Sequence, residues 1–81
     1  MNMIKKEGTL KEYESINGKQ LDFVIGKEDL QITCGETVEV FILGKWVETS
    51  IEMDRVRYYG EISGYKITNL NGKRARIKVY E

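Results

Sequence analysis

Residues 36–53 constrain the fold of this chain more than any other segment, because their pattern is that of a tight hairpin. In the first arm, Val38 and Val40 alternate with other residues, which is typical of a strand with one buried face. Gly44 and Lys45 form the predicted loop, since a glycine in the first loop position permits the positive φ of a type II′ turn. Apolar alternation resumes after the loop. The segment predicts two antiparallel strands and says little about chemistry.

Turn signals divide the rest of the chain into further short strands. Asn17-Gly18 predicts a hairpin, Ser63-Gly64 a turn, and Asn71-Gly72 a second hairpin-type turn. The expected strands are residues 8–16, 19–25, 55–62 and 74–80, with an irregular stretch at 27–35 and a short strand or connector at 65–70. The chain contains no proline and no convincing helical stripe.

This pattern predicts an all-β fold in which residues 1–81 form one small domain. We expect an antiparallel barrel of five or six strands, SH3-like, because closure removes the exposed edges that so small a domain can hardly cover. An oligonucleotide-binding-type barrel and a small sandwich are the alternatives.

The residue types that are missing exclude several chemistries. There is no histidine, and Cys34 is the only cysteine, so a common zinc site, an intrachain disulfide and a Cys-His or Ser-His-Asp site are all excluded. We expect Cys34 to be packed as a small apolar residue. No phosphate-binding glycine loop and no paired carboxylates with catalytic spacing are found. The chain is therefore not expected to be an enzyme or to need a metal or cofactor.

The N-terminal sequence and the charge distribution bear on location and partners. No apolar run is long enough to cross a membrane, and the start of the chain does not resemble a secretion signal, which together predict a cytoplasmic protein. Residues 1–54 carry a net charge of −5 and residues 55–81 a net charge of +5. We expect the two parts to interleave in space and neutralise each other.

Aromatic residues supply the first candidate site. Trp46 follows the central turn on a strand face that is otherwise polar, and Tyr58 and Tyr59 lie on a later strand. Together they could form an aromatic surface that binds a protein partner. The alternative is that Trp46 caps one end of the barrel.

Basic residues supply the second candidate site. Arg74, Arg76 and Lys78 share one face of the last predicted strand, with Arg55 and Arg57 expected beside them. Such a stripe could bind nucleic acid through the phosphates. The alternative is a solvated strand face that discourages edge pairing, and the overall neutrality of the chain argues against strong nucleic-acid binding.

Several short motifs resemble those of a bacterial family of short proteins of unknown function that is encountered in mobile elements and phage-derived regions. The motifs are Cys34-Gly35-Glu36, the Gly-x-Trp of residues 44–46, the Tyr58-Tyr59 pair and the Leu-x-Gly-x-x-Ala-Arg of residues 70–76. The chain departs from the family pattern with Tyr58 where a Trp is common and Ala75 where a Val is common. The resemblance implies a small cytoplasmic accessory protein and implies no activity.

Two functional hypotheses follow. A protein-interaction module using Trp46, Tyr58 and Tyr59 is favoured by the small size and zero net charge. A nucleic-acid-binding accessory protein using the basic stripe is the alternative. Pairing through an exposed strand would in addition make the protein a homodimer.

Overall fold

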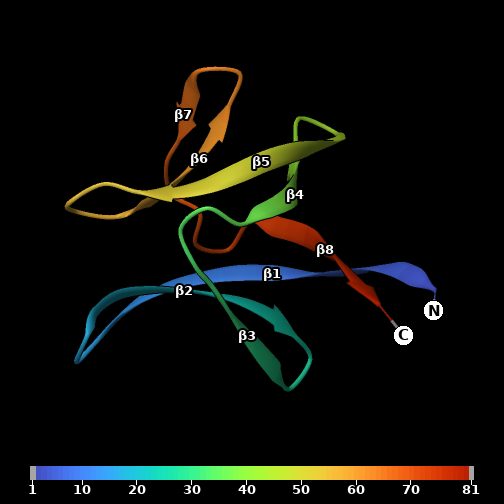
Figure 1. The fold of residues 1–81 in the computed structure, drawn as a ribbon, viewed down its shortest axis with the longest axis horizontal. Helices are drawn as coiled ribbons and strands as arrows, with labels where there is room; N and C mark the ends of the chain where they lie inside the picture. Colours follow the sequence, from blue (N-terminus) through green and yellow to red (C-terminus); the bar gives the residue numbers. More distant parts are fainter. Residues whose placement is uncertain (1, 81) are drawn as a thin grey trace.

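The computed structural model describes residues 2–80, which form one antiparallel sheet (Figure 1). The spatial order of its eight strands is β3-β2-β1-β8-β4-β5-β6-β7. The strands are β1 Met3–Ser15, β2 Gly18–Ile25, β3 Glu28–Ile32, β4 Thr37–Ile42, β5 Lys45–Met53, β6 Tyr58–Ile62, β7 Tyr65–Ile67 and β8 Arg74–Tyr80. Within the described residues no pairing joins the outer strands β3 and β7. The all-β antiparallel class is confirmed, but the predicted barrel of five or six strands is wrong.

The structure contains strands that the sequence pattern did not indicate. β3 forms in the stretch that we expected to be irregular, because Leu21 of β2 pairs with Ile32 and fixes the register of the acidic residues between the turn and Ile32. β1 begins at Met3 because β8 pairs with its polar first half. Residues 55–57 form a bend instead of a strand, and the Asp54 carboxylate accepts their main-chain hydrogen bonds at 2.7 and 2.9 Å.

Two predicted hairpins form with their loops one residue earlier than expected. The central loop is Leu43-Gly44, and φ is 49° and 80° at these residues. Positive φ at both positions defines a type I′ turn, not the predicted type II′. The first hairpin turns at Ile16 and Asn17, and Gly18, with φ of 99°, takes the left-handed position after the turn.

β4 begins at a turn that ends in a β-bulge. The turn spans residues 33–36, and the Glu36 N–H donates to the Thr33 carbonyl at 3.2 Å. Gly35 has φ of 96° and donates its N–H to the Ile51 carbonyl of β5, while the Ile51 N–H donates to the Glu36 carbonyl. Two residues thus oppose one, with a left-handed glycine first, which is the glycine type of bulge.

β8 begins at a turn of the same build. The turn spans residues 70–73, and the Lys73 N–H donates to the Leu70 carbonyl at 3.1 Å. Gly72 has φ of 86° and donates to the Leu10 carbonyl of β1, whose N–H donates to the Lys73 carbonyl. The predicted turn at Asn71-Gly72 is therefore present, but it starts a crossing to the centre of the sheet and not a hairpin.

These matching turns relate the two halves of the sheet by an approximate twofold axis. From the centre outwards, the β1 half runs β8-β1-β2-β3 and the β5 half runs β4-β5-β6-β7. Each central strand follows the outermost strand of the other half in sequence. Glu39 of β4 pairs with Arg76 of β8. These two residues are as far apart in sequence as the equivalent glycines Gly35 and Gly72, so the twofold axis relates them to each other. The axis therefore passes through the Glu39–Arg76 pair.

Both halves contribute to a single core on the inner side of the curled sheet. β2 contacts β6 across this core, and the Glu12 carboxylate accepts the Tyr58 N–H at 3.2 Å. The layers containing β1 and β5 lie on either side of β8 in Figure 1. The buried apolar residues are Leu10, Leu21, Phe23, Ile32, Val38, Val40, Ile51, Tyr58, Leu70 and Ala75.

Candidate binding site between β4 and β8

The central strands β4 and β8 are paired over a very short length. The register pairs Glu39 with Arg76 and Val40 with Ala75. The twofold axis would relate the Val40–Ala75 pair to a pair between Val38 and Ile77. That second pair is not formed. β4 and β8 therefore diverge on one side of the axis and leave an opening in the middle of the sheet.

A pocket of about 260 Å³ occupies this opening. Its apolar lining comes from Ile32, Val38 and Ile77, which face the core side of the sheet. Its polar lining consists of Glu36 at the bulge and of Thr37, Glu39, Glu48, Arg76 and Lys78 on the other face. The pocket thus joins an apolar floor to a charged rim of mixed sign.

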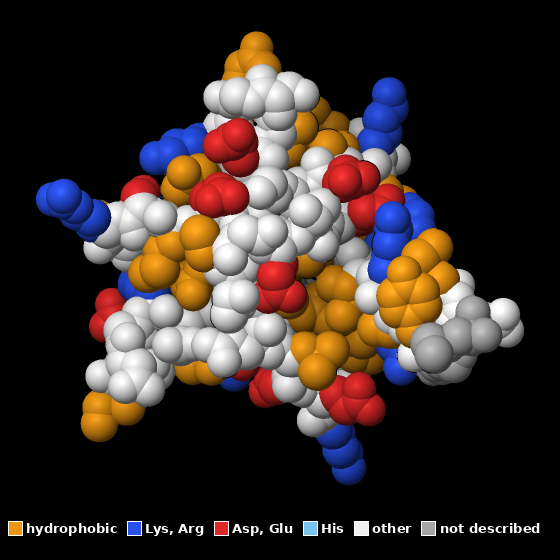
Figure 2. All heavy atoms as spheres, in the orientation of Figure 1, with side chains coloured by type: hydrophobic (Ala, Val, Ile, Leu, Met, Phe, Trp, Pro, Cys, Tyr) orange, Lys and Arg blue, Asp and Glu red, His pale blue; other side chains and the backbone are white. Residues whose placement is uncertain are grey.

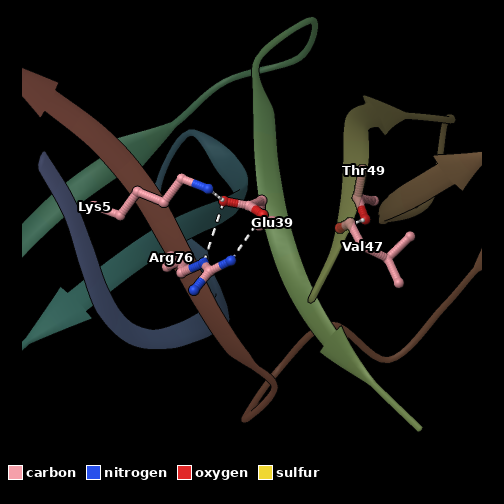
Figure 3. Close-up of polar contacts among 5 residues, drawn as sticks. All are labelled: Lys5, Glu39, Val47, Thr49 and Arg76. Carbon is pink, nitrogen blue, oxygen red and sulfur yellow. Dashed lines mark hydrogen bonds and ion pairs between the residues drawn. The ribbon is translucent and has the colours of Figure 1, made fainter. Parts of the chain in front are cut away.

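Glu39 is the centre of an ion-pair network beside the pocket (Figure 3). Its carboxylate accepts hydrogen bonds from Arg76 Nε at 3.2 Å and Arg76 Nη2 at 3.1 Å, and Lys5 Nζ lies 3.0 Å from Oε1. The bonds from Arg76, and then those from Lys5, hold the pKa of Glu39 down to about 2. The carboxylate is therefore ionised at neutral pH and positions the two cations instead of exchanging a proton.

Aromatic rings and arginines form a cluster on the opposite side of the twofold axis. Phe41 and Trp46 are register partners whose ring centroids lie 5.1 Å apart. The Arg76 guanidinium lies 4.4 Å from the Trp46 ring centre, and that of Arg74 lies 4.7 Å from the Phe41 ring centre. Arg74 also donates to the Glu7 carboxylate. We refer to Phe41, Trp46, Arg74 and Arg76 as the Trp46 cluster.

The structure brings together residues from both predicted sites and separates others. Trp46, Arg74 and Arg76 belong to the Trp46 cluster, and Lys78 lines the neighbouring pocket. Tyr58 is 7% exposed and is part of the core, so it adds nothing to an exposed aromatic surface.

The remaining predicted residues lie near the far end of β5. Tyr59 is half-buried, pairs with Glu52 and has Lys66 Nζ 4.3 Å above its ring. Arg55 and Arg57 are exposed in the bend before β6, which β4 and β5 separate from β8. The predicted grouping of these arginines with β8 is therefore wrong.

Several residues of the site were not predicted. No sequence pattern indicated Glu39, Lys5 or Phe41, because their contacts depend on the crossing that places β8 between β1 and β4. The prediction for Cys34 is also wrong, since this residue is exposed and its thiol lies 3.5 Å from the Glu52 carboxylate. No sequence signal indicated the exposed position of Cys34.

Charges of both signs are mixed on the surface. Figure 2 shows acidic and basic side chains side by side on the face in view, with no separate basic region there. The ion pairs of Arg74 with Glu7 and of Arg76 with Glu39 join the basic C-terminal segment to the acidic N-terminal one. The expected interleaving of the two parts is confirmed for these residues. In residues 2–80, no helix is long and apolar enough to span a membrane.

Comparison with known proteins places the chain in a family. Residues 11–77 match the family model described as Domain of unknown function (DUF5348), and the chain belongs to this family. The matched segment includes both glycine bulges and most of the pocket lining. No curated protein and no solved structure matches the chain.

Proposed function

We propose that this domain is a non-catalytic protein-binding module whose contact surface is the Trp46 cluster. The observation that carries the proposal is the stacking of Arg76 on the half-buried Trp46 ring beside an open pocket. Tryptophan and arginine are the residue types that most often dominate the binding energy of protein interfaces. The cluster therefore has the composition of an interface centre.

Fixed side chains also favour this role. Glu39 holds the Arg76 guanidinium with two hydrogen bonds, and Glu7 holds that of Arg74. A partner that docks here would order few additional side chains, so the entropic cost of binding is reduced. The same carboxylates reduce the positive charge available to phosphates, which favours a protein partner over nucleic acid.

The motif resemblance supports a more specific context. The Cys-Gly-Glu, Gly-x-Trp and Leu-x-Gly-x-x-Ala-Arg motifs resemble those of short proteins encountered in mobile elements and phage-derived regions. We propose that the domain acts in the cytoplasm as an accessory protein of such an element. Its partner is then a protein of the host or of the element.

A comparative pull-down tests the protein-binding role. The tagged wild-type protein, Trp46→Ala and the control Tyr65→Ala are used to capture proteins from bacterial lysate with and without nuclease. Tyr65 is a suitable control because it is 76% exposed on the outer strand β7, away from the Trp46 cluster. We expect one discrete partner that survives nuclease, binds Tyr65→Ala as well as wild type, and is lost with Trp46→Ala.

Two results would contradict the proposal. Proteins that are lost after nuclease, together with co-purified nucleic acid, would favour the nucleic-acid hypothesis. Equal capture by Trp46→Ala, with circular dichroism showing a folded variant, would remove the Trp46 cluster as the site.

A further inference from the structure

We propose that the partner contributes an extended segment with alternating acidic and apolar residues, which adds as a strand to the outer edge of β8 beyond Arg76. This inference rests on the proposed function and specifies the chemistry of the partner. Strand addition is a common mode of peptide recognition, in which the main chain supplies affinity and alternate side chains supply specificity.

The direction of the main-chain groups in β8 is the first argument. Leu10 of β1 exchanges hydrogen bonds with the bulge at Gly72 and Lys73. Because successive residues of an antiparallel strand direct their main-chain groups to opposite neighbours, Lys78 and Tyr80 direct theirs away from β1. On the side away from β1, no described strand is paired with β8 at these two residues. This edge is therefore open to an added strand.

The pocket beside this edge is the second argument. Its apolar lining, Ile32, Val38 and Ile77, lies on the core side of the sheet. The side chains of an added strand alternate between the two faces, so every second one would point into the pocket. The volume of about 260 Å³ is below the usual range of small-molecule sites. It suits one or two aliphatic side chains of a peptide.

Charge is the third argument. Lys5 and Lys78 are register partners on the outer face, where like charges oppose each other. Lys5 is paired with Glu39, whereas no described carboxylate pairs with Lys78. One acidic side chain beside Lys78 on the outer face of the added strand would neutralise this lysine, whereas Glu36 and Glu48 line the same pocket and are not complemented by it. The apolar and acidic positions of the partner must alternate because the pocket and Lys78 lie on opposite faces.

The two outer edges of the sheet are poorer sites. The edge strand β3 carries Glu28 and Asp29, and β7 has three residues. Charged and very short edge strands discourage strand addition. Among residues 2–80, the edge of β8 combines the pocket with Lys78, which no described carboxylate pairs.

A peptide titration followed by NMR tests the proposal on the isotope-labelled full chain. The probe is the blocked pentapeptide acetyl-Glu-Val-Glu-Val-Glu-amide, and the matched control is the same peptide with lysine in place of glutamate. We expect the glutamate peptide to shift the amide signals of Thr37, Val38, Lys78 and Tyr80, and to bind at least fivefold more tightly than the lysine peptide. A third peptide, N-methylated at the second valine and at the central glutamate, should lose at least tenfold in affinity because it cannot pair.

Two variants separate the edge from the charge. Lys78→Pro removes an N–H that points away from β1, so it should abolish binding while the β1–β8 pairing persists. Lys78→Gln should retain weak binding and lose the preference for the glutamate peptide. If Lys78→Pro does not fold, the N-methylated peptide alone decides whether the main chain is involved.

Several outcomes would overturn the proposal. These are the absence of shifts at millimolar peptide, shifts confined to β3 or β7, equal binding of both peptides, or full binding of the N-methylated peptide. Lys78 signals that change with protein concentration in the absence of peptide would assign the edge to a second copy of this chain. If the peptides fail while Trp46-dependent capture of a partner persists, strand addition is wrong and the protein-binding role stands.

Discussion

The two sides of the Glu39–Arg76 pair occupy equivalent places in the sheet but carry different residues. On one side Phe41 pairs with Trp46, and on the other Lys78 pairs with Lys5. Arg74 stacks on Phe41 on the first side, whereas the equivalent position on the second side is Thr37. Strand pairing continues on the aromatic side and stops on the lysine side.

This difference shows that side chains, and not the shared main-chain arrangement of the two halves, decide how far β4 and β8 pair on each side. Rings and guanidiniums pack across β4 and β8 on the aromatic side, and such contacts stabilise neighbouring strands. On the lysine side, one lysine is drawn to Glu39 and the other has no carboxylate among residues 2–80. The opening between the strands is the consequence, and it supplies the candidate site.

The largest predicted effect concerns two glycines, one in each half of the sheet, that are closely approached by other atoms. They are not related by the twofold axis, since Gly8 lies in β1 and Gly60 in β6. A Cβ on Gly8 would overlap the main-chain oxygen of Val24, and a Cβ on Gly60 would lie 2.5 Å from Cγ2 of Thr49. Gly8→Ala should lower the free energy of unfolding by about 3 kcal/mol, since a main-chain atom cannot move aside cheaply. Gly60→Ala should cost about 2 kcal/mol and should be largely rescued by Thr49→Ser, which removes the obstructing methyl group.

Urea denaturation of the four variants, including Thr49→Ser alone, measures these effects. We expect a second substitution to restore stability only in the β5 half, because only there is the obstructing atom a side-chain methyl group. Gly8→Ala as stable as wild type, or a double variant no better than Gly60→Ala, would show that the close approaches are not as described.

The central ion pair gives the next effect. Glu39→Gln leaves Lys5 and Arg76 without their carboxylate and should cost roughly 2 kcal/mol at pH 7, as for hydrogen bonds to charged groups. Because the pKa of Glu39 is lowered from 4.5 to about 2, its contribution is complete above the ordinary value and is lost as the pH falls towards 2. The stability difference between wild type and variant should therefore vanish between pH 4.5 and 2. A difference that does not change over this range would contradict the ion-pair account.

The two bulge glycines should respond alike. Gly35 and Gly72 have φ of 96° and 86°, and an added Cβ would meet nothing within 4 Å at either position. Gly35→Ala and Gly72→Ala should each cost about 1 kcal/mol, because the strain of the left-handed conformation is the same. Thermal unfolding of both variants checks this equality. Costs that differ by more than about 1 kcal/mol would break the proposed equivalence of the two bulges.

The smallest effect is a stabilisation at the central turn. Leu43 is 97% exposed and holds φ of 49°, which is unfavourable for leucine. Leu43→Asn creates the Asn-Gly pair that a type I′ turn prefers, and should add about 0.5 kcal/mol. Ser63-Gly64, the type I′ turn of the β6–β7 hairpin, is the internal comparison, and Ser63→Asn should give a similar gain. A loss of stability at both positions would argue against positive φ in these turns.

Local patterns in the sequence predicted the β1–β2 and β4–β5 hairpins and the turn between β6 and β7. The alternation of Val38 and Val40, and of Ala75 and Ile77, placed their strands and inward faces correctly, because strand periodicity is a local property. The left-handed preference of glycine located the turns to within one residue, as Leu43-Gly44 shows. The sequence did not reveal which glycines begin bulges, because Gly35 and Gly72 depend on partners in distant strands.

The arrangement of the strands could not be predicted from local patterns. The crossing that places β8 between β1 and β4 joins residues far apart in sequence, such as Glu39 and Arg76. Trp46 was correctly singled out, but its stacking on Arg76 depends on that crossing. Tyr58 and Tyr59 were expected to act with Trp46, but they pair near the far end of β5, about 20 Å along the strand.

Native-state hydrogen exchange of two equivalent amides tests the central claim most directly. Phe41 directs its N–H towards β8 next to the Val40–Ala75 pair, and Lys78, its counterpart across the twofold axis, directs its N–H towards β4 beyond the end of the pairing. The structure predicts that the Phe41 amide is protected at least a hundredfold more than that of Lys78, and that the Glu-Val pentapeptide slows exchange at Thr37 and Lys78. Equal protection of Phe41 and Lys78 in the free protein would show that β4 and β8 pair on both sides, and the opening that defines the site would not exist.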